Sequence, residues 1–207
     1  MPLLDELRST VSGLTTPEFL RCLIEDRFPG KTMVTASLRS SSIAVLKMVS
    51  EIDPHTPVLF CRRGTPFPES REYHDTIVEL LGLTNVSVTP GRESQTRTGD
   101  HEHCEEMWVE SKDGPGRSFE IAHLNDSLAP FDCWISAVYH VKHPDTGRHR
   151  VDVEGRLYRV DPLAGWSRKD VRDFIEQHNL PFHKRAYRSR MALPHRDHPA
   201  ATETFHV

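Results

Sequence analysis

The chain has 207 residues, of which 37% are hydrophobic and 27% charged, a composition typical of one polar globular domain. No apolar stretch approaches the length of a membrane span, no signal-peptide pattern opens the chain, and a net charge of −4 disfavours nucleic-acid binding. The four cysteines, Cys22, Cys61, Cys104 and Cys133, contain no Cys-x-x-Cys pair, which indicates a reducing compartment. We therefore expect a cytoplasmic protein with neither membrane nor nucleic-acid partners.

Two helices are expected ahead of the first strand. Residues 3–11 have an amphipathic pattern. Thr15 followed by Pro17 and Glu18 is typical of a helix start, because it combines a cap, a proline in the first turn and an acid near the positive end of the helix dipole. The inward face of this second helix is predicted to hold Phe19, Leu20, Leu23 and Ile24.

Strands and helices then alternate until about residue 88. Residues 33–36 and 57–60 are predicted strands, and a helical apolar stripe lies between them at Ile43, Leu46, Val49 and Ile52. Pro68 opens a further helix over 69–81, which Gly82 ends. This alternation predicts an α/β fold with a Rossmann-like, mostly parallel sheet and helices on both faces.

The second half begins with a polar loop over 89–117 and continues with a predicted helix over 119–128 and strands over 131–139 and 156–160. Ser167 and Asp170 form a capping box for a helix that ends near 179, with Val171, Phe174 and Ile175 inward. After Pro181 we expect an irregular basic tail. The predicted organisation is one domain over 15–183, with a helix in 1–14 and a tail over 184–207.

A serine-rich turn, Ser37 to Ser42, joins the first strand to its helix. Hydroxyls at a helix N-terminus suit a phosphate, because the free backbone N–H groups and the helix dipole point at the anion. The alternative is an ordinary turn in which a serine caps the helix.

Four motifs in order resemble the phosphoadenosine-phosphosulfate (PAPS) reductase family of the adenine-nucleotide alpha-hydrolase superfold, over roughly residues 15 to 190. The family reads strand, serine-bearing phosphate loop, helix, strand and then (Asp/Asn)-Thr-Gly-x-x-Phe-Pro-Glu-Thr. The matching segments here are the serine turn, Gly64-Thr65-Pro66-Phe67-Pro68-Glu69-Ser70, Phe131-Asp132-Cys133-Trp134-Ile135-Ser136-Ala137, and the stretch from Val160-Asp161-Pro162-Leu163-Ala164 to His178-Asn179-Leu180-Pro181-Phe182-His183.

The resemblance implies a nucleotide site at the carboxyl ends of the strands. The first turn would hold phosphate or sulfate oxygens, the second would flank adenine and ribose, and the segment after Trp134 would bring basic side chains to the anion. The alternative for this basic third of the chain is a solvated surface, and Arg62 and Arg63 replace the family's Asp/Asn-Thr, which suggests a changed ligand contact or a salt bridge to the acidic loop 93–113. The candidate site residues are Ser37, Arg39, Ser40, Ser41, Ser42, Arg62, Arg63, Gly64, His140, Lys142 and Arg148.

The chain departs from the family in its cysteines. The family's reductases attack the sulfonucleotide sulfur with a cysteine in a Glu-Cys-Gly-(Leu/Ile)-His tail, and the S-sulfocysteine is then reduced to release sulfite. Here the tail has Thr204 in that position, unless the similarity arises by chance, and no cysteine follows Cys133. We therefore expect any thiol to come from a small molecule or a partner protein.

One branch of the family holds an iron–sulfur cluster through cysteines whose counterparts here are His103, Cys104, His195 and His198. Three imidazoles exclude that cluster but suit zinc. The alternative is chance proximity in a chain with 13 histidines.

The sequence leaves three functions open. The first is an enzyme that binds PAPS, adenylyl sulfate or ATP and releases sulfite or transfers a sulfuryl group. The second is a non-catalytic nucleotide-binding subunit, and the third is an adenylating ATP pyrophosphatase. A relative of the tRNA-thiolating members is disfavoured by the acidic net charge. Family members often form homo-oligomers.

Overall fold

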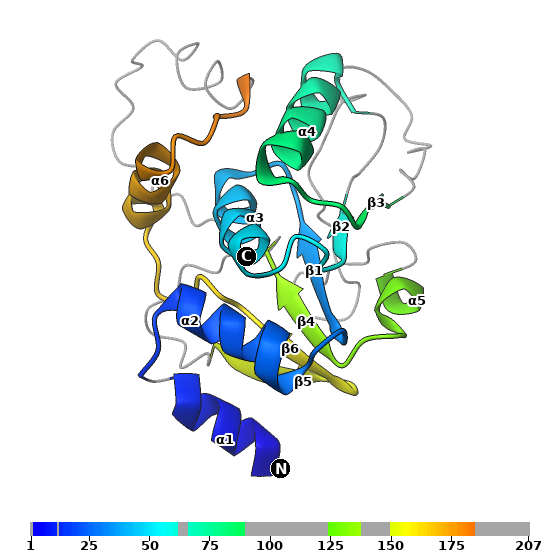
Figure 1. Ribbon diagram of the computed structural model, residues 1–207, viewed down its shortest axis with the longest axis vertical. Helices are drawn as coiled ribbons and strands as arrows, with labels where there is room; N and C mark the ends of the chain where they lie inside the picture. Colours follow the sequence, from blue (N-terminus) through cyan, green and yellow to red (C-terminus); the bar gives the residue numbers. More distant parts are fainter. Residues whose placement is uncertain (1, 12, 62–65, 90–123, 138–149, 185–207) are drawn as a thin grey trace, which may run out of the picture.

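A six-stranded sheet forms the centre of the computed structural model, which describes residues 2–11, 13–61, 66–89, 124–137 and 150–184 (Figure 1). The strands are β1 Thr32–Ala36, β2 Val58–Phe60, β3 Val86–Val88, β4 Cys133–Ser136, β5 Val151–Glu154 and β6 Leu157–Val160. The helices are α1 Pro2–Val11, α2 Thr16–Arg21, α3 Ser40–Ile52, α4 Pro68–Leu81, α5 Leu124–Leu128 and α6 Arg168–Gln177, and a π-helical segment, η1 Cys22–Arg27, continues α2.

The strand order is β3-β2-β1-β4-β6-β5, and every neighbouring pair is parallel except β5 and β6. From β1 the chain moves outward through β2 and β3 and then returns to place β4 on the other side of β1. The strand order therefore reverses between β1 and β4, which is where open parallel sheets bind their ligands. All five residues of β1 are buried, as expected for a strand inside a parallel sheet.

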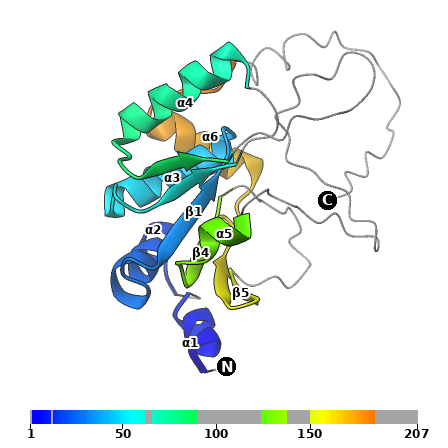
Figure 2. The ribbon, with the colours of Figure 1, turned by 90° about the vertical axis from the view of Figure 1, so that its right-hand side faces the viewer.

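The two faces of the sheet carry separate hydrophobic clusters, because successive strand residues point to opposite sides. Val34, Val58 and Phe60 belong to the larger cluster, which also contains the apolar residues of α2, α3, α4 and α6. Met33 and Leu59 belong to a smaller cluster that α5 covers. Figure 2 shows α4 and α5 on opposite sides of β1. The predicted α/β class, with helices on both faces of a mostly parallel sheet, is confirmed.

The helix signals in the sequence are confirmed at several ends. Thr15 and Ser167 each form a complete capping box, with Glu18 and Asp170 respectively. Gly82 ends α4 with φ 63°, in the left-handed region where glycine has no Cβ penalty.

Three segments differ from the sequence predictions. The second helix widens into the π-helical η1, although its predicted inward residues are buried. The strand predicted over 131–139 is shorter, at Cys133–Ser136. The strand predicted over 156–160 begins at Leu157, because Gly155 and Arg156 form a two-residue turn from β5, a strand that was not predicted. Of the helix predicted over 119–128, only 124–128 lies within the described residues.

The last described segment, residues 181–184, has an irregular backbone over 181–183 and is held against α4. The Tyr73 hydroxyl donates to the Pro181 carbonyl at 2.7 Å, and Lys184 forms an ion pair with Glu72 at 3.0 Å. The expected irregular tail is therefore anchored at its start. Within the described ranges, no helix has the length and apolar character needed to span a membrane.

Candidate active site at the carboxyl ends of β1, β2 and β4

The serine turn lies where the strand order reverses. The Ala137 N–H donates to Thr35 O at 2.9 Å, and the Cys61 N–H donates to Ala36 O at 2.8 Å. These hydrogen bonds hold the carboxyl ends of β4, β1 and β2 side by side, and α3 starts at this end of the sheet (Figure 1). The fold therefore brings together the chain segments that follow β1, β2 and β4, where the sequence predicts a nucleotide site.

Ser42 connects the serine turn to β4. Its side chain is fully buried, and its hydroxyl donates to Ala137 O at 2.6 Å. Ser42 Oγ also accepts a hydrogen bond from the Ser37 N–H at 3.1 Å and lies 3.0 Å from the Ser37 hydroxyl oxygen. A serine hydroxyl has one donor and two acceptor positions, and all three are used here. Ser42 therefore fixes the shape of the turn through hydrogen bonds that use all of its positions.

The start of α3 carries no serine cap, so the alternative of an ordinary serine-capped turn is wrong. The N-cap residue is Arg39, in an extended conformation (φ −85°, ψ 150°), and its side chain makes no capping hydrogen bond. An arginine side chain has no acceptor and cannot cap the amides of a helix. Among the described residues, no side chain accepts from the N–H groups of Ser40 or Ser41, which are both half-buried.

The start of α4 also has no side-chain cap. Its N-cap residue is Phe67, which has no polar side-chain atom, and Pro68 follows at the first helical position. The Ser70 and Arg71 N–H groups both turn back to the Phe67 carbonyl, at 3.0 and 3.1 Å. The segment that resembles the family's Phe-Pro-Glu-Thr turn thus forms the first turn of α4.

The described thiols near the site are buried. Burial raises the pKa of the Cys61 thiol, just after β2, to about 12, and burial likewise raises the pKa of the Cys133 thiol in β4 to about 12. A nucleophilic cysteine needs a lowered pKa, so neither thiol suits attack on sulfur. The remaining described cysteine, Cys22, lies in η1.

Two described arginines of the basic third make structural contacts. Arg150 donates to Leu14 O at 3.3 Å and to Thr16 Oγ1 at 2.9 Å, so it ties the start of α2 to the sheet. Arg156 is exposed but donates to carbonyl groups at and after the end of α5, including Leu128 O at 2.7 Å and Ala129 O at 2.6 Å. Arg168 and Arg172 lie exposed on α6, as the solvated-surface alternative expects.

Several predicted site residues lie outside the described residues. They are Arg62, Arg63, Gly64, His140, Lys142 and Arg148, and the zinc candidates His103, Cys104, His195 and His198. The acidic loop 93–113 and Thr204 also lie outside. Within the described part of the chain, no group of His, Cys, Asp and Glu residues is arranged to hold a metal ion.

Two polar pairings at this end of the sheet were not predicted. The Trp134 indole N–H donates to Thr35 Oγ1 at 2.8 Å, and Ser70 Oγ lies 3.0 Å from His183 Nε2. Both pairs join segments that are far apart in the sequence. The motifs themselves were identified, but their spacing along the chain carries no signal of the pairing.

A family model of the phosphoadenosine phosphosulfate reductase domain matches residues 31–189, which includes every described element of the site. The chain belongs to this family. The PAPS reductase resemblance in the sequence is thereby confirmed.

Curated relatives agree with the family model. A phosphoadenosine 5′-phosphosulfate reductase of Alkalilimnicola ehrlichii is 24% identical over 183 residues, which cover 87% of this chain and 74% of that protein. An adenosine 5′-phosphosulfate reductase of Mesorhizobium japonicum is 26% identical over 164 residues, which cover 79% of this chain and 64% of that protein. These relatives are reductases of sulfur metabolism, so the expectation of an oxidoreductase-type enzyme is confirmed.

A solved structure supports the fold. The phosphate complex of phosphoadenylyl-sulfate reductase from Candida auris superposes with a TM-score of 0.63, covers 90% of both chains and is 17% identical in sequence. At that identity the likeness shows the fold alone. The absence of the family's catalytic cysteine stays a prediction.

Proposed function

We propose that this PAPS reductase family member binds an adenine sulfonucleotide, PAPS or adenylyl sulfate, at the carboxyl ends of β1, β2 and β4. We further propose that it releases sulfite with thiols supplied by a small molecule or a partner protein. The observation that carries the proposal is the serine turn, in which Ser42 is tied to Ala137 while the start of α3 keeps a non-capping Arg39.

An anion fits this arrangement for electrostatic reasons. The first-turn N–H groups of a helix carry a partial positive charge and need an acceptor. The half-buried Ser40 and Ser41 would add their hydroxyls, and Arg39 would add a fixed positive charge. A phosphate or sulfate group would provide the acceptor oxygens that no described side chain provides.

The reaction would proceed in two thiol steps. A thiolate attacks the sulfur of the sulfonucleotide, the bond from sulfur to the phosphate oxygen breaks, and the nucleotide leaves with that electron pair. A second thiol then attacks the thiol sulfur of the S-sulfo intermediate, so that sulfite leaves and a disulfide forms. The two thiols are oxidised together by two electrons, and the sulfonate sulfur is reduced to sulfite.

The source of the thiols follows from burial. Cys61 and Cys133 are both buried, and both thiols have a raised pKa of about 12. Among the described residues this leaves no cysteine suited to be the nucleophile at the site. The burial of these two thiols supports the proposal that a dithiol from outside the domain reaches the bound sulfonucleotide.

The test combines binding with turnover. Calorimetric titrations with PAPS, adenylyl sulfate, ATP and AMP would be run on the protein and on a Ser41→Ala/Arg63→Ala variant. Sulfite release would be measured with dithiothreitol and radiolabelled sulfonucleotide. We expect one sulfonucleotide to bind, the variant to lose that binding, and sulfite to form only when the dithiol is present.

Each other outcome has a definite meaning. Binding of a sulfonucleotide without sulfite would favour the non-catalytic subunit and contradict the catalytic part of the proposal. Binding of ATP alone, with release of pyrophosphate, would favour the adenylating alternative. No binding of any nucleotide would contradict the proposal as a whole.

A further inference from the structure

Ser70 and His183 form a buried pair at the start of α4. Ser70 Oγ lies 3.0 Å from His183 Nε2, although the two residues are 113 positions apart. Ser70 is 1% exposed and His183 is 8% exposed. Ser70 ends the Phe67–Ser70 turn and His183 ends the Leu180–His183 segment, so the contact joins two of the motifs that mark this family.

Tyr73 reinforces the contact one turn further along α4. Its ring packs edge-on against the His183 imidazole, with centroids 4.9 Å apart at 76°. Its hydroxyl donates to Pro181 O at 2.7 Å, and burial raises the pKa of this phenol, which keeps the donor protonated. Ser70, Tyr73, Pro181 and His183, which we name the α4 latch, thus hold the segment after α6 against the first turn of α4.

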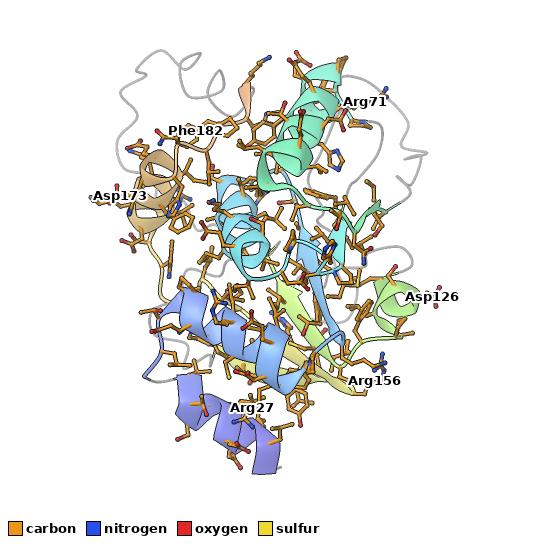
Figure 3. All side chains as sticks on the ribbon, viewed as in Figure 1. Arg27, Arg71, Asp126, Arg156, Asp173 and Phe182 are labelled. Carbon is orange, nitrogen blue, oxygen red and sulfur yellow. The ribbon has the colours of Figure 1, made fainter. Side chains whose placement is uncertain are left out.

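The first turn of α4 is also the end of the connection that leaves β2. On the sheet side, His74 packs edge-on against Phe60, the last residue of β2, with centroids 4.6 Å apart. The start of α4 is therefore packed against the end of β2 on one side and held to the segment after α6 on the other. Figure 3 shows Arg71 on this part of α4 and Phe182 on the segment that the latch holds.

We propose that His183 is a positioning residue for the nucleotide site, which acts through its hydrogen bond to Ser70. By fixing the first turn of α4, it fixes the turn that follows β2 at the carboxyl end of the sheet, where the nucleotide site is proposed. This inference rests on the proposed function for the nature of the ligand, whereas the latch itself rests on described contacts alone.

A buried polar pair suits this task because its two members depend on each other. If one partner is removed, this buried hydrogen bond between the two segments is lost, which favours local opening of the turn. The opening would be confined to the latch and the chain next to it. A residue needed only for overall stability would instead affect α6 and the sheet to the same extent.

The experiment measures local opening and binding on the same full-length variants. Hydrogen exchange followed by mass spectrometry would compare peptides over 66–73 with peptides over 170–177 in α6, for Ser70→Ala, His183→Ala and the double variant. Calorimetry with PAPS and with adenylyl sulfate would report binding. We expect exchange over 66–73 to rise about tenfold in each single variant, without a further rise in the double variant.

Two further variants separate positioning from simple damage. His183→Gln can place an amide group near the position of the imidazole Nε2, so we expect it to restore slow exchange and most of the affinity. Glu72→Gln, which breaks the exposed ion pair to Lys184, is the matched control on the same turn. It should change neither the exchange rate over 66–73 nor the sulfonucleotide affinity. If His183→Ala fails to fold, Ser70→Ala removes only a hydroxyl and tests the same contact.

The outcomes distinguish a failure of the latch from a failure of the proposed nucleotide binding. Equal increases in exchange over 66–73 and in α6, or unchanged exchange over 66–73, would overturn the latch. Fast exchange over 66–73 with unchanged affinity would overturn its role in binding. If the unmodified protein binds neither sulfonucleotide, the proposed function is contradicted. Hydrogen exchange over 66–73 still decides whether His183 positions the first turn of α4.

Discussion

The four helix starts at α2, α6, α3 and α4 are built in two different ways. At α2 and α6 a hydroxyl and an acid pair reciprocally with the backbone: Thr15 with Glu18, and Ser167 with Asp170. At α3 and α4, which follow the neighbouring strands β1 and β2, the N-cap residues are Arg39 and Phe67, and neither forms a side-chain cap.

The difference separates local stability from function. The capping boxes satisfy the first-turn N–H groups from within the helix, and the paired acids are stabilised in their charged form. The pKa of the Glu18 carboxyl is lowered by the hydrogen bond from the Thr15 side chain, and that of Asp170 by the hydrogen bond from the Ser167 backbone. At the start of α3, after β1, no described side chain accepts from the Ser40 and Ser41 N–H groups, which suits an outside acceptor such as an anion. At the start of α4, after β2, the Ser70 and Arg71 N–H groups bond to the Phe67 carbonyl instead of to a side chain.

The largest expected effect comes from breaking the serine turn at Ser42. Ser42→Ala leaves the Ala137 carbonyl and the Ser37 N–H without their partner in a buried place. We expect a loss of about 3 kcal/mol in the free energy of unfolding, measured with urea, and loss of sulfonucleotide binding. The matched control is Ser50→Ala on the same helix, where the hydroxyl bonds only to Lys47 O. Similar losses in both variants would contradict the special role of Ser42.

Intermediate effects are expected at the capped starts. Thr15→Ala and Ser167→Ala should each lower the free energy of unfolding by about 1 kcal/mol, with no change in sulfonucleotide affinity. The carboxylates of Glu18 and Asp170 have lowered pKa values, so their contribution is present above the pKa of the unfolded chain. It is lost as the pH falls through the folded pKa, and the effect of each variant should shrink in acid. Reduced affinity in either variant would break the comparison between the two kinds of helix start.

The smallest effect on stability is expected at Ser41. The Ser41 side chain is half-buried, and among the described contacts its hydroxyl forms no hydrogen bond. Ser41→Ala should therefore change the free energy of unfolding by less than about 0.5 kcal/mol, while weakening sulfonucleotide binding measured by calorimetry. Unchanged affinity would remove Ser41 from the site and leave only the backbone N–H groups as ligand contacts.

The sequence predicted those parts of the fold that depend on local signals. Thr15, Ser167 and Gly82 mark helix ends through side-chain and backbone preferences that act within a few residues. The apolar stripes of α3 and α6 were read from helical periodicity, and the serine turn was placed correctly by its position after β1. The strand β5 was missed, although Val151 and Val153 alternate with acids ahead of the Gly155 turn.

The remaining features depend on contacts between distant segments. Nothing near Ser42 indicates that Ala137 O will accept its hydroxyl, and this contact decides that Ser42 shapes the turn. The pairing of Ser70 with His183 likewise arises only when α6 returns the chain to α4. Serine residues after a strand also favour a capped helix on local grounds, and only the extended conformation of Arg39 shows that the helix starts without such a cap.

The most direct test of the uncapped start compares two neutral residues at position 39. Arg39→Ala and Arg39→Ser remove the same charge, but only serine can cap α3. Calorimetric titration of both variants with the sulfonucleotide that binds the unmodified protein is the deciding measurement. We predict that Arg39→Ala binds about fivefold more tightly than Arg39→Ser, because the new serine cap competes with the ligand for the same N–H groups by about 1 kcal/mol. Equal affinities, or tighter binding by Arg39→Ser, would contradict the claim that these N–H groups hold the ligand.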